Sequence, residues 1–313
     1  MADAIVYTEF GGPEVLTLSQ ITIPVPGPGE IALRVEAAGV NPIDWKLRSG
    51  LRPSGPIVEP RGVGSDAAGV VTAIGDDVEG FRVGDAVVVV GAHGAYATHI
   101  VVPAGKAQPR PPQVTAAQGA AVGVPAGTAY QSLRSLAVGA GDTLLILGGS
   151  GAVGQAAIQF AVLWGATVIA TASPRRFDRV RALGATPVEY GDGLEERVRA
   201  AAPQGVTVIL DAAGTDDGIE ASLRLLDDKT RIATIVRGRD AAGYGIRAFA
   251  GGSPEPLTAQ QLTWRAEAIP VTLALIEAGR FTIELGPTVP LADAPEAHRL
   301  VQEGVDGKVV LAP

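Results

Sequence analysis

The chain of 313 residues contains no cysteine, and aromatic residues make up only 4% of it. Without cysteine the protein can form no disulfide bond, no thiolate nucleophile and no structural zinc site held by sulfur. The sequence also lacks a run of 18 apolar residues and a basic segment near Met1. We therefore expect no membrane contact and no secretory signal, which leaves a cytoplasmic enzyme as the expectation.

Positive charge is scarce as well. The 25 Lys and Arg are scattered, and 33 Asp and Glu outnumber them, which gives a net charge of −8. Binding of nucleic acid requires a basic patch that displaces counterions, so we expect no nucleic-acid partner. The length and the apolar fraction of 47% are sufficient for two domains with well-packed cores.

The most informative segment runs from Thr143 to Ser173. Its first five residues, Thr143–Leu147, are mostly branched and apolar, as in a buried strand of a parallel sheet. A glycine-rich turn follows, then residues with one apolar helical face, and then a second buried strand at Thr167–Ala170. This order of strand, turn, helix and strand predicts a βαβ unit.

Gly149, Gly151 and Gly154 have the spacing G-x-G-x-x-G, in the strand–turn–helix context that this motif requires. The alternative is a plain glycine-rich turn, because the chain has 41 glycines. We favour a dinucleotide site, in which open amides at the helix N-terminus bind a pyrophosphate. The residues predicted to make this contact are Gly149, Ser150, Gly151, Ala152 and Val153.

The rest of the chain divides by pattern. Short strand-like runs separated by turn residues fill residues 1–110 and predict a partly closed β-barrel. Strands and helices alternate from about residue 125 to 260, which predicts a doubly wound parallel sheet. Pro125 is expected to break a helical pattern near this boundary, and the last segment should return to the β-rich module. We predict one domain from residues 1–122 and 263–313, and a second from residues 123–262.

Several motifs together resemble a known family. They are Gly39–Asp44, Gly64–Gly69, Val83–Asp85, Gly127–Tyr130, Gly148–Gly154, Leu183–Ala185, Glu189–Tyr190 and Gly307–Leu311. The chain resembles the zinc-free quinone oxidoreductases, the zeta-crystallin-like branch of the medium-chain dehydrogenase/reductase superfamily. This resemblance implies an α/β protein with a GroES-like catalytic domain and a Rossmann domain, and a substrate cleft between them. It also implies a homodimer formed through an edge strand of the Rossmann sheet.

The resemblance bears on metal chemistry too. Zinc-dependent relatives have Cys where this chain has Asn41, and Gly-His-Glu where it has Gly64–Asp66. Without the thiolate and the imidazole, no zinc is expected here. Quinones and activated double bonds remain as substrates, because they carry the developing charge on their own oxygen.

The cofactor is predicted from the residues after the second strand of the βαβ unit. An NAD site usually has Asp or Glu there, whereas this chain has Ser173, Arg175 and Arg176, with no acid before Asp178. The arginines could pair with a 2′-phosphate and Ser173 could donate to it. The alternative, that the arginines only solvate a helix start, is weakened because Arg is unfavourable there. We predict NADPH; by resemblance, Tyr190 and either Arg175 or Arg176 contact the adenosine phosphate.

Other candidates rest on the resemblance or on position. By resemblance, Asn41 bonds the nicotinamide or a substrate oxygen, and Thr128 lies near the carboxamide. The alternatives are that Asn41 starts a turn and that Thr128 is a helix residue satisfied by backbone. Ala213 and Val236 follow the fourth and fifth Rossmann strands, where ligands bind through backbone groups. Lys46 could polarise a substrate oxygen, or be a solvated surface lysine.

Three further expectations complete the interpretation. Asp44 and Asp66 are expected to bond neighbouring amides, and His298 to be structural or exposed. Lys46 and Arg52 stand where relatives have tyrosines, so the proton donor stays open. The leading hypothesis is an NADPH-dependent reductase of quinones or α,β-unsaturated carbonyls. The alternatives are an enoyl-thioester or pathway-specific reductase, a cyclase of this fold, and a non-catalytic NADPH-binding protein.

Overall fold

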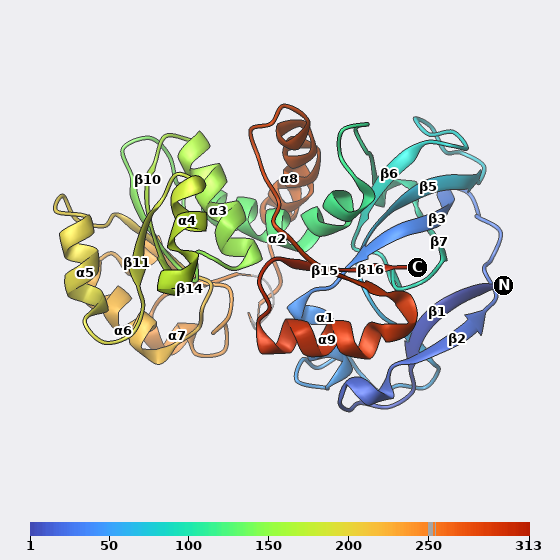
Figure 1. Ribbon diagram of the computed structural model, residues 1–313, viewed down its shortest axis with the longest axis horizontal. Helices are drawn as coiled ribbons and strands as arrows, with labels where there is room; N and C mark the ends of the chain where they lie inside the picture. Colours follow the sequence, from blue (N-terminus) through green and yellow to red (C-terminus); the bar gives the residue numbers. More distant parts are fainter. Residues whose placement is uncertain (250–252, 254) are drawn as a thin grey trace. The chain divides into compact units, whose positions relative to one another are not determined.

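The computed structural model describes residues 1–249, 253 and 255–313, and the chain divides into two compact units (Figure 1). Unit 1 comprises Met1–Val124 and Ile269–Pro313, and unit 2 comprises Pro125–Ala268. The chain passes from one unit to the other inside the helices α2 (Ala116–Ser135) and α8 (Ala259–Glu277). In the part of the chain that is described, no helix combines the length and the apolar content needed to cross a membrane.

Unit 1 contains two β-sheets. The smaller sheet has the order β2-β1-β4, and the larger has the order β15-β16-β3-β5-β6-β8, with β7 also on β3. The strands are β1 (Ala2–Tyr7), β2 (Thr17–Ile21), β3 (Glu30–Gly39), β4 (Arg61–Gly62), β5 (Asp66–Ile74), β6 (Ala86–Val90), β7 (His99–Pro103), β8 (Ala107–Pro109), β15 (Leu285–Pro290) and β16 (Lys308–Ala312).

The long strand β3 organises the larger sheet. It pairs antiparallel with β5 along one edge and with β7 and β16 along the other. Its pairing with β5 shifts register at two points, which lets the strand bend so that residues on both of its faces are buried. Ile31, Leu33 and Val35 contribute to one apolar core cluster, and Ala38 to another. Because β16 pairs with Ala38 and Gly39, the C-terminal segment returns to the β-rich unit, as predicted.

Two helical segments bear on the predictions. The turn that was the alternative role for Asn41 is the start of a helix, α1 (Pro42–Arg48), whose first residue is proline, as its fixed φ favours. The break expected at Pro125 is wrong, because α2 continues through this residue. A proline removes one helical hydrogen bond, and this cost is offset here by the buried side chains of Val122 and Ala126 on either side. The remaining helix of unit 1 is α9 (Ala294–Glu303).

Unit 2 is a parallel sheet with the order β11-β10-β9-β12-β13-β14. Its strands are β9 (Thr143–Leu147), β10 (Thr167–Ala172), β11 (Thr186–Glu189), β12 (Val208–Asp211), β13 (Ile232–Thr234) and β14 (Arg247–Ala248). Its helices, besides parts of α2 and α8, are α3 (Ala152–Leu163), α4 (Phe177–Ala182), α5 (Leu194–Ala201), α6 (Asp216–Leu225) and α7 (Ala241–Tyr244).

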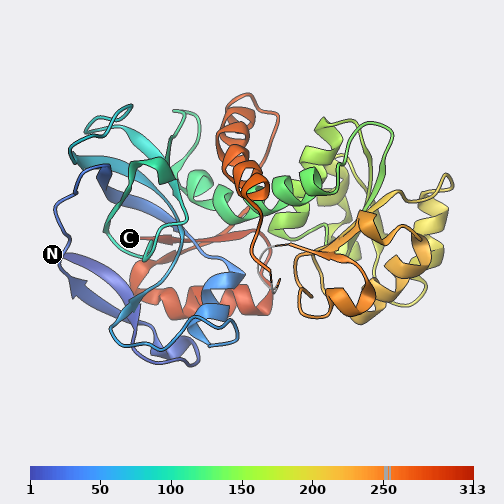
Figure 2. The same ribbon diagram turned by 180° about the vertical axis from the view of Figure 1, so that it is seen from behind.

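This sheet is covered on both faces. Leu145, Ile169 and Ile209 form a core cluster with residues of α5, α6 and α7. Helices α3 and α4 pack on the other face (Figures 1 and 2). The predicted doubly wound sheet is therefore present, and its strand order reverses between β9 and β12. The sequence also allows a further strand over residues 246–250; β14 lies within this range, and residue 250 lies outside the described residues.

Candidate functional site

The glycine-rich loop connects β9 to α3 and is anchored to β10. Gly148 has φ 83, a left-handed conformation that glycine adopts without strain. The Gly148 amide donates to Thr171 Oγ1 at 2.8 Å, and the Gly149 amide donates to the Thr171 carbonyl at 2.8 Å. The loop is thus fixed against the neighbouring strand.

The three motif glycines have different physical roles. A Cβ on Gly149 would lie 2.5 Å from Ala170 Cβ, and a Cβ on Gly154 would lie 2.2 Å from the Gly148 carbonyl oxygen. These two positions need glycine for packing. A Cβ on Gly151 would meet nothing closer than 3.6 Å. The protein itself therefore does not require glycine at Gly151, whereas close approach of a ligand to the backbone would.

Donors at the start of α3 are open. The amides of Ser150, Ala152 and Val153 donate to no acceptor within the described residues. Gln155 Nε2 donates to the Ser150 carbonyl at 2.8 Å, and Arg179 Nε donates to Gln155 Oε1 at 2.8 Å. These bonds fix the orientation of the peptide group that follows Ser150. The arrangement suits an anion such as a pyrophosphate.

The ends of β10 and β11 carry the predicted adenosine contacts. Arg175 is exposed, and Ser173 and Arg176 are half-buried, at a short 3-10 helix that follows β10. The first acidic side chain after β10, Asp178, is paired with Arg181 at 2.9 Å. Tyr190, directly after β11, is 59% exposed, which leaves its ring accessible to a ligand.

Two buried residues missed by the sequence analysis fix the ends of β12 and β13. Asp211 Oδ1 accepts from the amides of Ala213 at 3.0 Å and Gly214 at 2.8 Å. Asp211 Oδ2 accepts from Thr234 Oγ1 at 2.6 Å, and Thr234 Oγ1 in turn accepts from the Val236 amide at 3.1 Å. The signal available in the sequence was a polar residue ending each of two apolar strands.

These bonds determine which backbone groups Ala213 and Val236 can offer. Both amides are engaged by Asp211 and Thr234. Their carbonyl oxygens accept no hydrogen bond in the part of the chain that the structure covers. The two residues therefore present acceptors, which suits a ligand amide. Thr128 is buried, and its Oγ1 accepts from Arg265 Nη2 at 2.9 Å, so a side chain rather than backbone satisfies it.

Unit 1 contains a buried polar cluster around Asn41. Lys308 is 5% exposed, and its Nζ donates to the Val40 carbonyl at 2.6 Å and to Asn41 Oδ1. Asn41 Nδ2 donates to Asp66 Oδ2 at 2.9 Å, which also accepts from the Val124 amide at 2.9 Å. Both ends of the Asn41 amide are therefore held by charged side chains.

Asp44 lies in the same cluster. Its Oδ2 accepts from the backbone amide of Asn41 at 2.8 Å and from the Tyr96 hydroxyl at 2.8 Å. Burial raises the pKa of Asp44 to about 7 and lowers the pKa of Lys308 to about 8. The expectation that Asp44 and Asp66 bond neighbouring amides is confirmed.

His298 packs beside this cluster, with its ring edge against Tyr96 at a centroid distance of 5.8 Å. It is fully buried, and burial lowers its pKa to about 3, so it is neutral at pH 7. A neutral, buried ring supports the structural role expected for it.

The two predicted catalytic residues differ in exposure. Asn41 is fully buried, so the structure supports a role in holding the cluster, and its contact with a nicotinamide or substrate stays a prediction. Lys46 is half-buried, with its Nζ 5.6 Å from the centroid of the Trp45 ring. Its predicted role also stays a prediction.

Comparison with known proteins covers both units. Residues 27–112 match the family described as the alcohol dehydrogenase GroES-like domain, and residues 152–248 match the family described as zinc-binding dehydrogenase. Quinone oxidoreductase from Sus scrofa is 31% identical, over 99% of this chain and 98% of the relative. The predicted combination of GroES-like and Rossmann folds is confirmed.

Two solved structures are similar over the whole chain. Escherichia coli quinone oxidoreductase in complex with NADPH has a TM-score of 0.84 and 27% identity, and the match covers 99% of this chain and 100% of that chain. A mycobacterial protein in complex with NADPH has a TM-score of 0.83 and 31% identity, with 100% of both chains covered.

The second family description raises the question of zinc. Protein zinc sites need three or four His, Cys, Asp or Glu ligands close together. Among residues 1–249, 253 and 255–313, no group of three such side chains is placed to hold a metal ion. At Asn41 the neighbouring group is the Lys308 ammonium, which would repel a second cation. The residues present at this position do not fit zinc.

Proposed function

Since this chain belongs to the quinone oxidoreductase family of the medium-chain dehydrogenases and reductases, we propose that it transfers hydride from NADPH to a small quinone or α,β-unsaturated carbonyl. The observation that carries this proposal is the carboxyl edge of the parallel sheet in unit 2. There two arginines after β10, an open glycine loop after β9 and a pair of backbone acceptors after β12 and β13 follow neighbouring strands of the sheet, in the order adenosine phosphate, pyrophosphate and nicotinamide along a dinucleotide.

The residues after β10 favour the phosphate-bearing cofactor. Arg175 and Arg176 supply the positive charge that a 2′-phosphate requires, and Ser173 supplies a hydroxyl donor. The nearest acid, Asp178, is engaged by Arg181, so a carboxylate that would bond an unmodified ribose is missing from this stretch of the described chain. Tyr190 would lie against the adenosine part.

The pyrophosphate would be held by the amides of Ser150, Ala152 and Val153, with Gly149 and Gly151 allowing the backbone to approach it. The carbonyls of Ala213 and Val236 would accept from a carboxamide, and Thr128 retains a hydroxyl proton to donate. When bound, NADPH supplies the hydride.

In unit 1 we assign Asn41 to the substrate side of the reaction. Asn41 is oriented by Lys308 and Asp66, and in this proposal its Nδ2 gives up the 3.4 Å bond to the Gly39 carbonyl and donates to the oxygen on which negative charge develops. Lys46 is the second candidate for this task. The homodimer and the cytoplasmic location expected above belong to the same proposal.

The arginine assignment can be tested by replacing Arg175 and Arg176 together with Ala. Loss of two charge-assisted contacts to a phosphate should raise the Kd for NADPH by about 100-fold or more, and the Kd for NADH by less than about threefold. Isothermal titration calorimetry of both cofactors measures this. Arg239→Ala, which removes one exposed charge from another loop of unit 2, is the control. Equal losses for the two cofactors would contradict the phosphate assignment.

Turnover separates the substrate classes. The wild-type protein with NADPH should reduce quinones or enals in a panel that also includes enoyl thioesters. Reduction of enoyl thioesters alone would support that alternative instead. Binding of NADPH without turnover of any member would favour a non-catalytic protein.

A further inference from the structure

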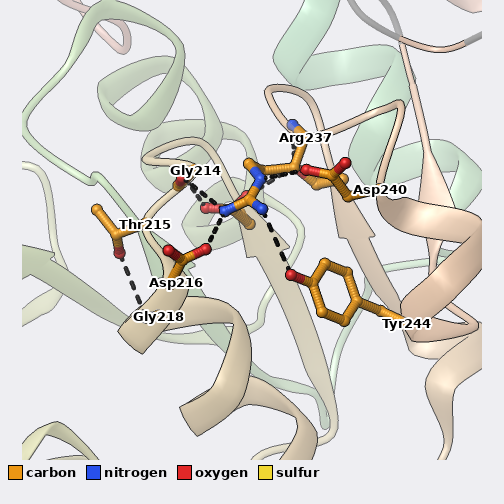
Figure 3. Close-up of polar contacts among 9 residues, drawn as sticks. Gly214, Thr215, Asp216, Gly218, Arg237, Asp240 and Tyr244 are labelled. Atoms are coloured by element: carbon orange, nitrogen blue, oxygen red, sulfur yellow. Dashed lines mark hydrogen bonds and ion pairs between the residues drawn. The ribbon is translucent and has the colours of Figure 1, made fainter.

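Arg237 joins the two loops that follow β12 and β13. Figure 3 shows its guanidinium between Asp216 and Asp240. Nη1 lies 2.5 Å from Asp216 Oδ1 and 3.5 Å from the Gly214 carbonyl, both after β12, and Nε lies 2.7 Å from Asp240 Oδ2, after β13. The Arg237 side chain is 24% exposed, whereas the Asp216 and Asp240 side chains are 76% and 48% exposed, so these ion pairs lie at the surface and hold the loops mainly through their shared geometry.

The two loops also pack directly on each other. Gly214 has φ 74, and a Cβ at this position would lie 2.5 Å from Val236 Cγ1. Nearer the strands, Asp211 and Thr234 hold the amides of Gly214 and Arg237. The loops are therefore tied at their base by buried hydrogen bonds and at their outer side by the Arg237 guanidinium.

The place of these loops in the sheet identifies the part of the ligand that they face. The proposed phosphate contacts, Arg175 and Arg176, follow β10, on one side of the point where strand order reverses. Strands β12 and β13 lie on the other side. A dinucleotide spans such a point, so its nicotinamide half would lie over the ends of β12 and β13.

We propose that Arg237 is a positioning residue, which holds the loops of residues 212–216 and 235–240 together and so fixes the carbonyls of Ala213 and Val236 for the nicotinamide half of the cofactor. This inference rests on the proposed function. It assigns no contact between Arg237 and the cofactor. Its consequence is that affinity for the nicotinamide half depends on Arg237, and affinity for the adenosine half does not.

The chain supplies controls for this idea. Arg239 is exposed, lies in the same loop and makes no hydrogen bond or ion pair with any described residue, so Arg239→Met removes the same charge without untying the loops. Arg197 is the counterpart at the other end of the sheet. It donates to the carbonyls of Glu189 at 2.9 Å, Gly191 at 3.2 Å and Asp192 at 2.7 Å, in the loop that contains Tyr190.

The experiment compares two ligands by calorimetry: NADPH, and adenosine 2′,5′-bisphosphate, which lacks the nicotinamide half. Arg237→Met should raise the Kd for NADPH about tenfold, the equivalent of one misplaced hydrogen bond, and change the Kd for the bisphosphate less than about twofold. Arg239→Met should change neither, and Arg197→Met should weaken both. Arg237→Lys, which can reach only one of the two carboxylates, should lie between wild type and Arg237→Met.

Other results decide against the proposal. An Arg237→Met variant that binds both ligands with wild-type affinity shows that the two loops keep their binding conformation without Arg237. Equal weakening of both ligands, with a melting temperature lowered by more than a few degrees, shows a general structural role. If the wild-type protein binds neither ligand, the proposed function itself fails, and this inference fails with it.

Discussion

Replacement of Asp44 with Asn should change the free energy of unfolding, relative to wild type, more favourably at neutral pH than at acidic pH. Asp44 is 4% exposed, and the groups that face it are the Lys308 ammonium, the Asp66 carboxylate, the Tyr96 hydroxyl and the Asn41 amide. The asparagine carboxamide oxygen can accept the same two hydrogen bonds as Asp44 Oδ2. The variant therefore removes the titration and keeps the geometry.

The magnitude follows from linkage. The pKa of Asp44 is 3.8 in an unfolded chain and about 7 in the folded protein, so the folded state binds the proton more tightly. The contribution of Asp44 to the free energy of unfolding is fully present below pH 3.8 and is lost as the pH rises to 7. The loss amounts to about 2 kcal/mol at pH 5 and about 4 kcal/mol at pH 7.5. Asp44→Asn should therefore gain roughly 2 to 3 kcal/mol on wild type between these two pH values.

Guanidinium denaturation of both proteins at the two pH values measures this change. The difference between variant and wild type cancels the titration of groups that do not interact with Asp44, and Lys308, whose pKa the Asp44 charge raises, is the main coupled group that remains. Asp192→Asn, at an exposed carboxylate, controls for loss of a negative charge as such. A difference that stays the same at both pH values would refute the reasoning, because it would mean that burial does not disfavour the charged form of Asp44.

Three further predictions concern unit 2. Gly151→Ala should bind NADPH at least about tenfold more weakly with an unchanged melting temperature, because its Cβ has room in the protein. Gly154→Ala should lower the melting temperature, because its Cβ would overlap the Gly148 carbonyl. Thermal melts measure stability and calorimetry measures NADPH affinity. A lowered melting temperature for Gly151→Ala and an unchanged one for Gly154→Ala would contradict the roles assigned to these glycines. Thr234→Val should cost about 2 to 4 kcal/mol of unfolding free energy, because it leaves the amides of Val236 and Arg237 and one oxygen of Asp211, Oδ2, without hydrogen-bond partners. Chemical denaturation measures it, with exposed Thr167→Val as control, and a loss equal to that of the control would count against this role.

Local signals in the sequence determined much of unit 2. The run Thr143–Leu147, the glycines after it and the apolar helical face predict β9, the loop and α3, because each signal acts within a few residues. The same applies to the residues after β10, where the absence of an acid and the presence of Arg175 and Arg176 depend only on the order of the chain.

The tertiary structure determined the contacts between residues that lie far apart in the sequence. Lys308 and Asn41 are 267 positions apart, and only the pairing of β16 with β3 brings an ammonium to the Asn41 amide. Pro125 interrupts a local pattern, yet α2 continues because its neighbours are buried. Asp211 and Thr234 looked like ordinary strand ends, and Arg237 like a charged loop residue. Their roles arise because parallel strands place their carboxyl ends side by side, and no pattern along the chain carries that information.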